Sequence, residues 1–283
     1  MLTSIISLLA AATYGVGDFF GALGGRRSHP IFVSFIGHIF YAITAFVGLL
    51  IFQGTWSHDA TLTGVLTGAS EALGFLVFYY ALTLGRVALV APLVSVIYAL
   101  VPVLWGLATG DHLSNLGWLG LVLGLVAVLA LSFEKPDQDD ESGKTGRRVL
   151  VFAIIGGVMW GFSTVALSFA PKDSGMVPVL IAGLTAFLLL LIIVGLFTKT
   201  VVGSYQRGAF TPSMVSGILF GAANLLIITA LRYGQLSLVG MLTALYPLAT
   251  VLLARIFMRE QITALQWFGI LSAVSAAVLL SQG

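Results

Sequence analysis

Two acidic side chains stand inside long apolar stretches of the sequence. Asp18 lies in TYGVGDFFGALGG and Glu71 lies in ASEALGF, and neither stretch contains a second charge. An ionised carboxyl group facing hydrocarbon costs at least about 2.5–3.5 kcal/mol, so both side chains are expected to face a bundle interior or a water-filled cavity. A carboxyl group in such a place can alternately bind a proton and a cation.

Aromatic side chains with polar tips accompany these acids, namely Tyr14, Tyr98, Trp160 and Tyr246. At about 1.5 Å per residue, all four lie roughly 14–17 Å from one end of their predicted helices. Aromatic rings can attract an ammonium group by about 0.5–2 kcal/mol. Their alternative role is structural packing.

Three further residues complete the predicted site. Phe75 lies one helical turn from Glu71 on the same helix face, and Asn224 is expected at a depth similar to that of Glu71. His38 lies at a depth close to that of Asp18 and is a candidate partner for it. We therefore predict small-molecule binding by Tyr14, Glu71, Phe75, Tyr98, Trp160, Asn224 and Tyr246, and proton coupling by Glu71, Asp18 and His38. The alternative for each acid is structural: a pair with His38 or a backbone group for Asp18, and a protonated, hydrogen-bonded carboxyl for Glu71.

The composition indicates that lipid surrounds these residues. Hydrophobic residues make up 59% of the chain and charged residues 8%, against about 25% charged in soluble domains, and the mean hydropathy is +1.07. No basic tract runs through aromatic residues, so a nucleic-acid partner is not expected. The chain has no cysteine, and the acidic run from Asp137 to Glu141 has no accompanying histidine. We expect neither a metal nor a cofactor.

Apolar stretches long enough to span a membrane recur along the whole chain, and we place ten: 2–23, 30–52, 62–83, 87–109, 114–133, 149–170, 176–197, 211–232, 236–257 and 262–281. The first lacks the basic start and short core of a secretory signal, so we expect a retained helix. The tight junctions at 83–87 and 232–236 leave open one very long helix at each, although Gly85 and Gly234 suit turns. Prolines at 102 and 247 are expected to bend the fourth and ninth spans.

The two halves of the chain resemble each other. DHLSNLGWLG at 111–120 matches EQITALQWFG at 260–269 with an offset of 149 residues, and Ser114 and Thr263 are predicted N-caps. Because each half holds an odd number of spans, the second half must enter the membrane from the opposite side. We predict an all-α integral membrane fold of ten transmembrane helices in two inverted five-helix repeats, with boundaries at 1–133, a polar cytoplasmic linker at 134–148, and 149–283.

This pattern resembles the drug/metabolite transporter superfamily and, within it, the EamA-type ten-helix members. The paired motifs at 111–120 and 260–269 carry the resemblance, together with Tyr14-Gly15 and Trp160-Gly161, which open each half. The resemblance covers nearly the whole chain and implies the fold and a transport activity. It does not specify the solute, because the family handles amino acids, amines, nucleotide sugars and other metabolites, and it assigns no role to Asp18 or Glu71.

Lysine and arginine predict the orientation. The connections after the first, third, fifth, seventh and ninth spans hold eleven of these residues and the other face holds two. Because cytoplasmic loops are enriched in Lys and Arg, we predict both termini outside, in a multi-pass protein of the cell membrane, specifically a bacterial inner membrane. The sequence leaves the oligomeric state open, a homodimer included.

Together these features predict a secondary transporter of amine or amino-acid-like solutes that works by alternating access, with Glu71 linking protons to the small-molecule substrate. No motif for ATP use is present. One alternative is an uncoupled exchanger or facilitator of a neutral metabolite in which both acids are structural. A passive channel is another, and a lipid-modifying membrane enzyme is a third. The four scattered histidines supply no catalytic cluster, so we expect no enzyme.

Overall fold

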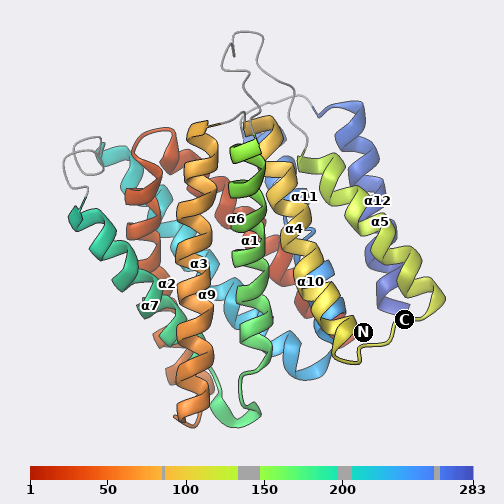
Figure 1. Ribbon diagram of the computed structural model, residues 1–283, viewed down its shortest axis with the longest axis horizontal. Coiled ribbons are helices and arrows are strands. Elements are labelled where there is room, and N and C mark those ends of the chain that lie inside the picture. The colour runs from red at the N-terminus through yellow and green to blue at the C-terminus, as the bar shows by residue number, and fades with distance from the viewer. Residues whose placement is uncertain (85–86, 133–146, 197–205, 258–261, 283) are drawn as a thin grey trace.

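The computed structural model describes residues 1–84, 87–132, 147–196, 206–257 and 262–282, and within these ranges all regular structure is helical (Figure 1). The elements are α1 (Leu2–Gly25), α2 (Pro30–Phe52), α3 (His58–Leu84), α4 (Val87–Ala108), α5 (Asn115–Ser132), α6 (Arg147–Ser168), η1 (Lys172–Ser174), α7 (Val177–Leu196), η2 (Arg207–Ala209), α9 (Phe210–Tyr233), α10 (Leu236–Thr243), α11 (Pro247–Phe257) and α12 (Ala264–Gln282). The polar linker predicted at 134–148 falls almost entirely outside the described residues.

Seven helical stretches in the described ranges are long and apolar enough to cross a membrane, with α10 and α11 counted as one stretch. Shorter apolar helices lie in α4, α5 and α12. The all-helical membrane fold is therefore confirmed, whereas the inverted ten-helix repeat stays a prediction. At the 232–236 junction, Gly234 adopts an extended conformation and α9 and α10 are separate helices. Residues 85–86, in the other tight junction, lie outside the described residues.

The N terminus and the junctions at 53–57, 109–114, 169–176 and 234–235 lie at one end of the bundle, which we call the terminal face (Figure 1). Two of these junctions join directly: the Thr55 amide donates to the Asp173 carbonyl at 2.8 Å, and the Met176 amide donates to the Gln53 carbonyl at 3.3 Å. The Arg232 guanidinium donates to the Gly175 carbonyl. The two bonds between junctions connect the first half of the chain with the second, and the Arg232 bond lies within the second half.

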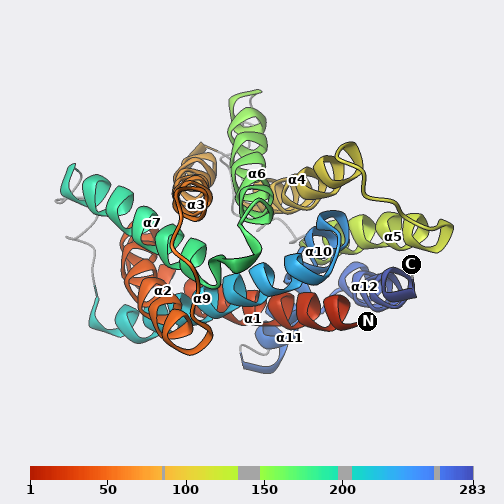
Figure 2. The same ribbon diagram turned by 90° about the horizontal axis from the view of Figure 1, so that it is seen from below.

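Long-range packing pairs helices from different halves. α1 and α2 pack along α9, α3 packs along α6 and α7, and α5 pairs with α12 at one side of the bundle (Figure 2). Small residues line the crossings, since a Cβ at Gly68 or Gly217 would overlap the backbone of Ala182 or Gly37. In lipid, where burial of apolar surface gives little driving force between helices, such close backbone approach strengthens van der Waals packing.

The predicted N-caps are confirmed in both halves. The Ser114 hydroxyl accepts from the Gly117 amide at 3.1 Å and opens α5, and the Thr263 hydroxyl accepts from the Gln266 amide at 3.2 Å and opens α12. The helices at the two prolines, both expected to bend, differ in continuity. The chain is interrupted before Pro247, between α10 and α11, whereas α4 stays helical through Pro102.

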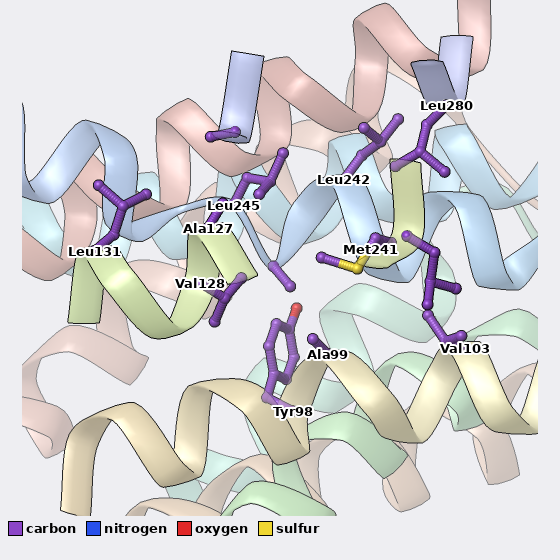
Figure 3. Close-up of a cluster of buried hydrophobic side chains, with 13 residues drawn as sticks. Tyr98, Ala99, Val103, Ala127, Val128, Leu131, Met241, Leu242, Leu245 and Leu280 are labelled. Atoms are coloured by element: carbon purple, nitrogen blue, oxygen red, sulfur yellow. The ribbon is translucent and has the colours of Figure 1, made fainter. Parts of the chain in front are cut away.

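A buried apolar cluster joins α4, α5, α10 and α12 (Figure 3). Val103, Met241 and Leu242 are almost fully buried in it. Tyr98 projects from α4 toward this cluster, so its ring lies at the boundary between the apolar core and the candidate site.

Candidate functional site

Three of the predicted aromatic residues form a row of rings at the centre of the bundle. The Tyr246 ring, between α10 and α11, lies 6.3 Å from the Tyr14 ring of α1 and 6.1 Å from the Tyr98 ring of α4, measured between centroids. The Tyr246 hydroxyl lies 3.3 Å from the Ser95 hydroxyl. The structure thus brings together polar-tipped rings from both halves of the chain.

The aromatic-glycine pairs at the start of each half position two of the site residues. A Cβ at Gly15 would overlap the Tyr246 carbonyl, and a Cβ at Gly161 would lie 3.0 Å from the Tyr98 carbonyl. Only glycine lets these backbones approach so closely. The preceding residue in each pair, Tyr14 or Trp160, is thereby carried to the centre of the bundle.

Trp160 acts on the backbone of Glu71. Its indole Nε1 donates to the Glu71 carbonyl at 3.1 Å, its ring occupies the space that Gly74 leaves open, and it lies 5.1 Å from the Phe78 ring. Trp160 therefore holds the segment of α3 that carries the carboxyl group.

Asn224 connects α9 with α1. Its side-chain amide donates to the Tyr14 hydroxyl at 2.9 Å and to the Phe220 carbonyl at 3.2 Å. The Phe220 ring lies 5.3 Å from the Tyr14 ring. Asn224 is buried, so these two bonds fix the orientation of its amide and of the Tyr14 hydroxyl.

The Glu71 carboxyl is the most unusual group of the site. The residue is only 8% exposed, and neither carboxyl oxygen has a hydrogen-bond partner among the described residues. The Asn224 amide and the Tyr41 hydroxyl lie close enough to interact with this carboxyl, but neither makes a hydrogen bond of good geometry to it, and the buried Tyr41 hydroxyl makes none to any other described residue. Leaving a buried polar group unpaired costs about 1–3 kcal/mol. The Glu71 carboxyl can therefore accept either a proton or a hydrogen bond from a donor group of a ligand.

Asp18 and His38 do not form the ion pair considered from the sequence. The His38 Nδ1 lies 2.8 Å from the Ser34 carbonyl, one turn earlier on α2. Asp18 is half-buried on α1 and lies within electrostatic reach of Tyr14 and Tyr246. Asp18 thus belongs to the same central region as the rings, and the sequence alternative of a structural pair with His38 is not realised.

Phe75 is half-buried on α3, one turn from Glu71, and is not part of the ring row. Two other neighbours of the site were missed from the sequence. Ser95 lies three residues before Tyr98, and this spacing places both on one helix face. The spacing could have identified Ser95 as a neighbour of the site from the sequence. Tyr41 carries no such signal, because a single tyrosine in an apolar helix resembles any packing residue.

Metal binding has no support in the described part of the chain, where no three His, Cys, Asp or Glu side chains gather closely enough to hold an ion. The central groups are instead the carboxyls of Glu71 and Asp18, one amide, several hydroxyls and ring faces. Such a set suits an organic solute with hydrogen-bond donors.

Comparison with known proteins agrees with this picture. A solved structure described as "Crystal structure of protein" superposes with a TM-score of 0.74 and 17% identity, covering 99% of this chain and 96% of the other. A Methanocaldococcus jannaschii protein, "Uncharacterized protein MJ1333.1", is 28% identical over 130 residues, which are 45% of this chain and 94% of that protein. The model of the EamA-like transporter family matches residues 1–133 and 147–282. The chain therefore belongs to the EamA-like transporter family and is a multi-pass membrane transporter of small solutes.

Proposed function

We propose that this protein is a proton-coupled secondary transporter of amines or amino-acid-like solutes, which bind at Glu71 between two inverted five-helix halves. The observation that carries this proposal is the buried, unpartnered Glu71 carboxyl beside the ring row of Tyr14, Tyr246 and Tyr98. Secondary transporters commonly bind substrate near the membrane midplane, at the interface of such repeats.

The pattern of helix packing supports the inverted repeat. Under the proposed equivalence, α1, α2 and α3 correspond to α6, α7 and α9. The packing of α1 on α9 then matches that of α6 on α3, and the packing of α2 on α9 matches that of α7 on α3. The length of the archaeal relative, about that of one half, is also consistent with a repeat built from one such unit.

The chemistry of the site favours a cationic solute. An ammonium group donates hydrogen bonds, which the Glu71 oxygens and the Tyr41 hydroxyl can accept, and ring faces add cation–π attraction. Within the described ranges every lysine and arginine lies in a junction or within three residues of a helix end. The site therefore offers a cation the Glu71 carboxylate, with Asp18 nearby, and the described residues offer an anion no positive charge at this site.

Proton coupling follows if Glu71 binds either a proton or the ammonium group. Each state satisfies the buried carboxyl, and neither leaves an uncompensated charge inside the bundle. Asp18 is the second proton-binding candidate and His38 the third. Alternating access would then move the two halves about the fixed site. In the proposed orientation both termini lie outside a bacterial inner membrane, and the face opposite the terminal face lies in the cytoplasm.

Reconstitution into liposomes tests this function directly. We expect a pH gradient to drive uphill accumulation of a radiolabelled amine or amino acid, identified beforehand by thermal stabilisation of the purified protein with a metabolite panel. Glu71→Gln should abolish the pH-driven accumulation, and Trp56→Phe, far from the site in an exposed junction, should retain it.

Other outcomes favour the alternatives. Exchange of a neutral metabolite that is independent of pH and unchanged in Glu71→Gln would make both acids structural and the protein an uncoupled exchanger. Flux that only ever runs down the solute gradient and does not saturate would indicate a channel.

A further inference from the structure

A second candidate binding place lies on the outside of the bundle, between α3 and α6. A hollow of about 490 Å³ is lined by Tyr80 near the end of α3 and by Arg147, Arg148, Val151 and Phe152 in the first turns of α6. These residues lie at the end of the bundle opposite the terminal face. The hollow is remote from the central site and plays no part in the proposed transport chemistry.

Among the described residues, the charged groups that line this hollow are both positive. Arg147 and Arg148 are both exposed, and within the described residues neither forms an ion pair or a hydrogen bond through its guanidinium group. Every acidic side chain in the described ranges lies either on the terminal face or inside the bundle, namely Asp18, Asp59, Glu71, Asp111 and Asp173. Two guanidinium groups therefore face one hollow without a described counter-ion.

The other wall of the hollow is apolar and continues onto the side of the helix bundle. The Tyr80 and Phe152 rings meet edge to face, with centroids 4.8 Å apart. Val151 is 43% exposed, and the next turn of the same helix face exposes Ile154 and Ile155. In a membrane protein such a surface faces acyl chains. The hollow thus joins a cationic rim to a lipid-facing apolar strip.

We propose that this hollow binds an anionic phospholipid, with the headgroup phosphate held by Arg147 and Arg148 and an acyl chain lying along Val151 and Ile154. Guanidinium groups suit phosphate because their planar donors can bind two oxygens at once. Basic pockets between membrane helices on the cytoplasmic side are places where acidic lipid headgroups bind. A free phosphate shares the headgroup chemistry but has no use for the apolar wall.

Titration of short-chain lipids into the purified full-length protein, followed by native mass spectrometry, tests the proposal. Dioctanoyl phosphatidylglycerol should bind more tightly than dioctanoyl phosphatidylcholine. Arg147→Gln and Arg148→Gln should each weaken phosphatidylglycerol binding about fivefold, and the double variant about 30-fold. Arg207→Gln, an exposed arginine in η2, is the matched control and should change binding less than twofold.

Three results would overturn the proposal. Equal losses for Arg148→Gln and Arg207→Gln would mean a diffuse surface charge rather than a site. Phosphatidylcholine binding as tightly as phosphatidylglycerol in the wild type would remove the role of headgroup charge. Inorganic phosphate competing at the same concentration as the lipid, with Val151→Ser leaving lipid binding unchanged, would indicate a free-anion site. The melting temperature of each variant without lipid checks that it is folded.

Discussion

The third helices of the two halves carry the same kinds of residue in opposite order. On α3 the polar Glu71 precedes Phe75 by four residues, and on α9 the aromatic Phe220 precedes Asn224 by four. With the 149-residue offset, Glu71 corresponds to Phe220 and Phe75 to Asn224. One half thus contributes an unpartnered carboxyl, and the other contributes an amide whose donors are already used by Tyr14 and Phe220. Under the proposed repeat, the two halves therefore divide the chemistry of the site unequally.

The fourth helices differ in a second way. α4 runs unbroken from Val87 to Ala108 through Pro102, whereas the corresponding segment splits into α10 and α11 at Ala244–Tyr246, before Pro247. Proline lacks the amide that would bond four residues back. The Thr243 carbonyl instead accepts from the Tyr246 amide at 3.1 Å, in a tighter three-residue turn. The interruption therefore occurs at a ring of the candidate site, in one half only.

Replacing the polar groups on the third helices is expected to have the largest effect on transport. Glu71→Gln should lower amine transport by 100-fold or more, because removing one partner of a buried charge pair costs about 3–5 kcal/mol. Asn224→Leu should lower it only about fivefold, since it removes a neutral hydrogen bond worth about 1 kcal/mol. Initial rates in proteoliposomes at matched protein content measure both. Equal losses would mean that the two halves contribute equivalent groups.

Glycine contacts offer the next test. Gly15→Ala should lower the free energy of unfolding by about 1–3 kcal/mol, because the new methyl group overlaps the Tyr246 carbonyl and cannot be accommodated by a side-chain rotation. Gly161→Ala should cost less, because its Cβ would come no nearer than 2.6 Å to any atom, the Val101 Cβ, and 3.0 Å to the Tyr98 carbonyl, whereas the Gly15 Cβ would lie closer still to the Tyr246 carbonyl. Gly25→Ala, also in α1, is the control, with open space around it. Detergent melting curves would contradict the comparison if Gly161→Ala were the more damaging.

Substitutions of the prolines in the fourth helices should affect the transport rate without affecting stability to the same extent. Pro247→Ala permits a continuous helix through Tyr246 and is expected to lower the transport rate several-fold with little loss of melting temperature. Pro102→Ala should leave the rate nearly unchanged, because α4 is already continuous. Paired rate and melting measurements decide this, and a larger rate loss for Pro102→Ala would show that the interruption has no functional part.

The smallest expected effect concerns a single hydrogen bond between helices. The Thr250 hydroxyl of α11 donates to the Gly15 carbonyl of α1 at 3.0 Å, whereas the position of α4 that corresponds to Thr250 under the 149-residue offset is Val101, which has no hydroxyl. Thr250→Val should cost about 0.6 kcal/mol, the usual size of such bonds in membrane proteins. Thr229→Val is the control, because that hydroxyl bonds only within its own helix, to Leu225. A null difference between the two variants would mean that the bond does not stabilise the contact.

Much of the fold was predictable because membrane helices leave strong local signals. The length of the apolar stretches predicted the helices to within a few residues, and the Ser114 and Thr263 caps follow from short-range hydrogen bonding. A bend was expected at both prolines, and the helix is interrupted before Pro247 but is continuous through Pro102. Whether a proline interrupts a helix depends on what its neighbours can satisfy, and that is not a local property.

The candidate site was predictable in depth but not in pairing. Counting residues along each helix brought Tyr14, Tyr98 and Tyr246 to a common level, because the rise per residue is constant. It also suggested the Asp18–His38 pair, which the structure does not form, and His38 Nδ1 instead lies 2.8 Å from the Ser34 carbonyl of its own helix. Tyr41 was missed for the same reason: depth says nothing about which way a side chain points.

The sequence by itself determined that this chain is a helical membrane protein, where its helices begin and end, and which acids lie inside the bilayer. These are properties of composition and of local hydrogen bonding. Only the tertiary structure decided which side chains meet: that Trp160 holds the Glu71 backbone, that Asn224 holds Tyr14, and that Glu71 itself is left without a partner. Such contacts depend on how helices from different halves are rotated and how they cross. Close backbone packing at glycines sets this arrangement, and no local sequence pattern encodes it.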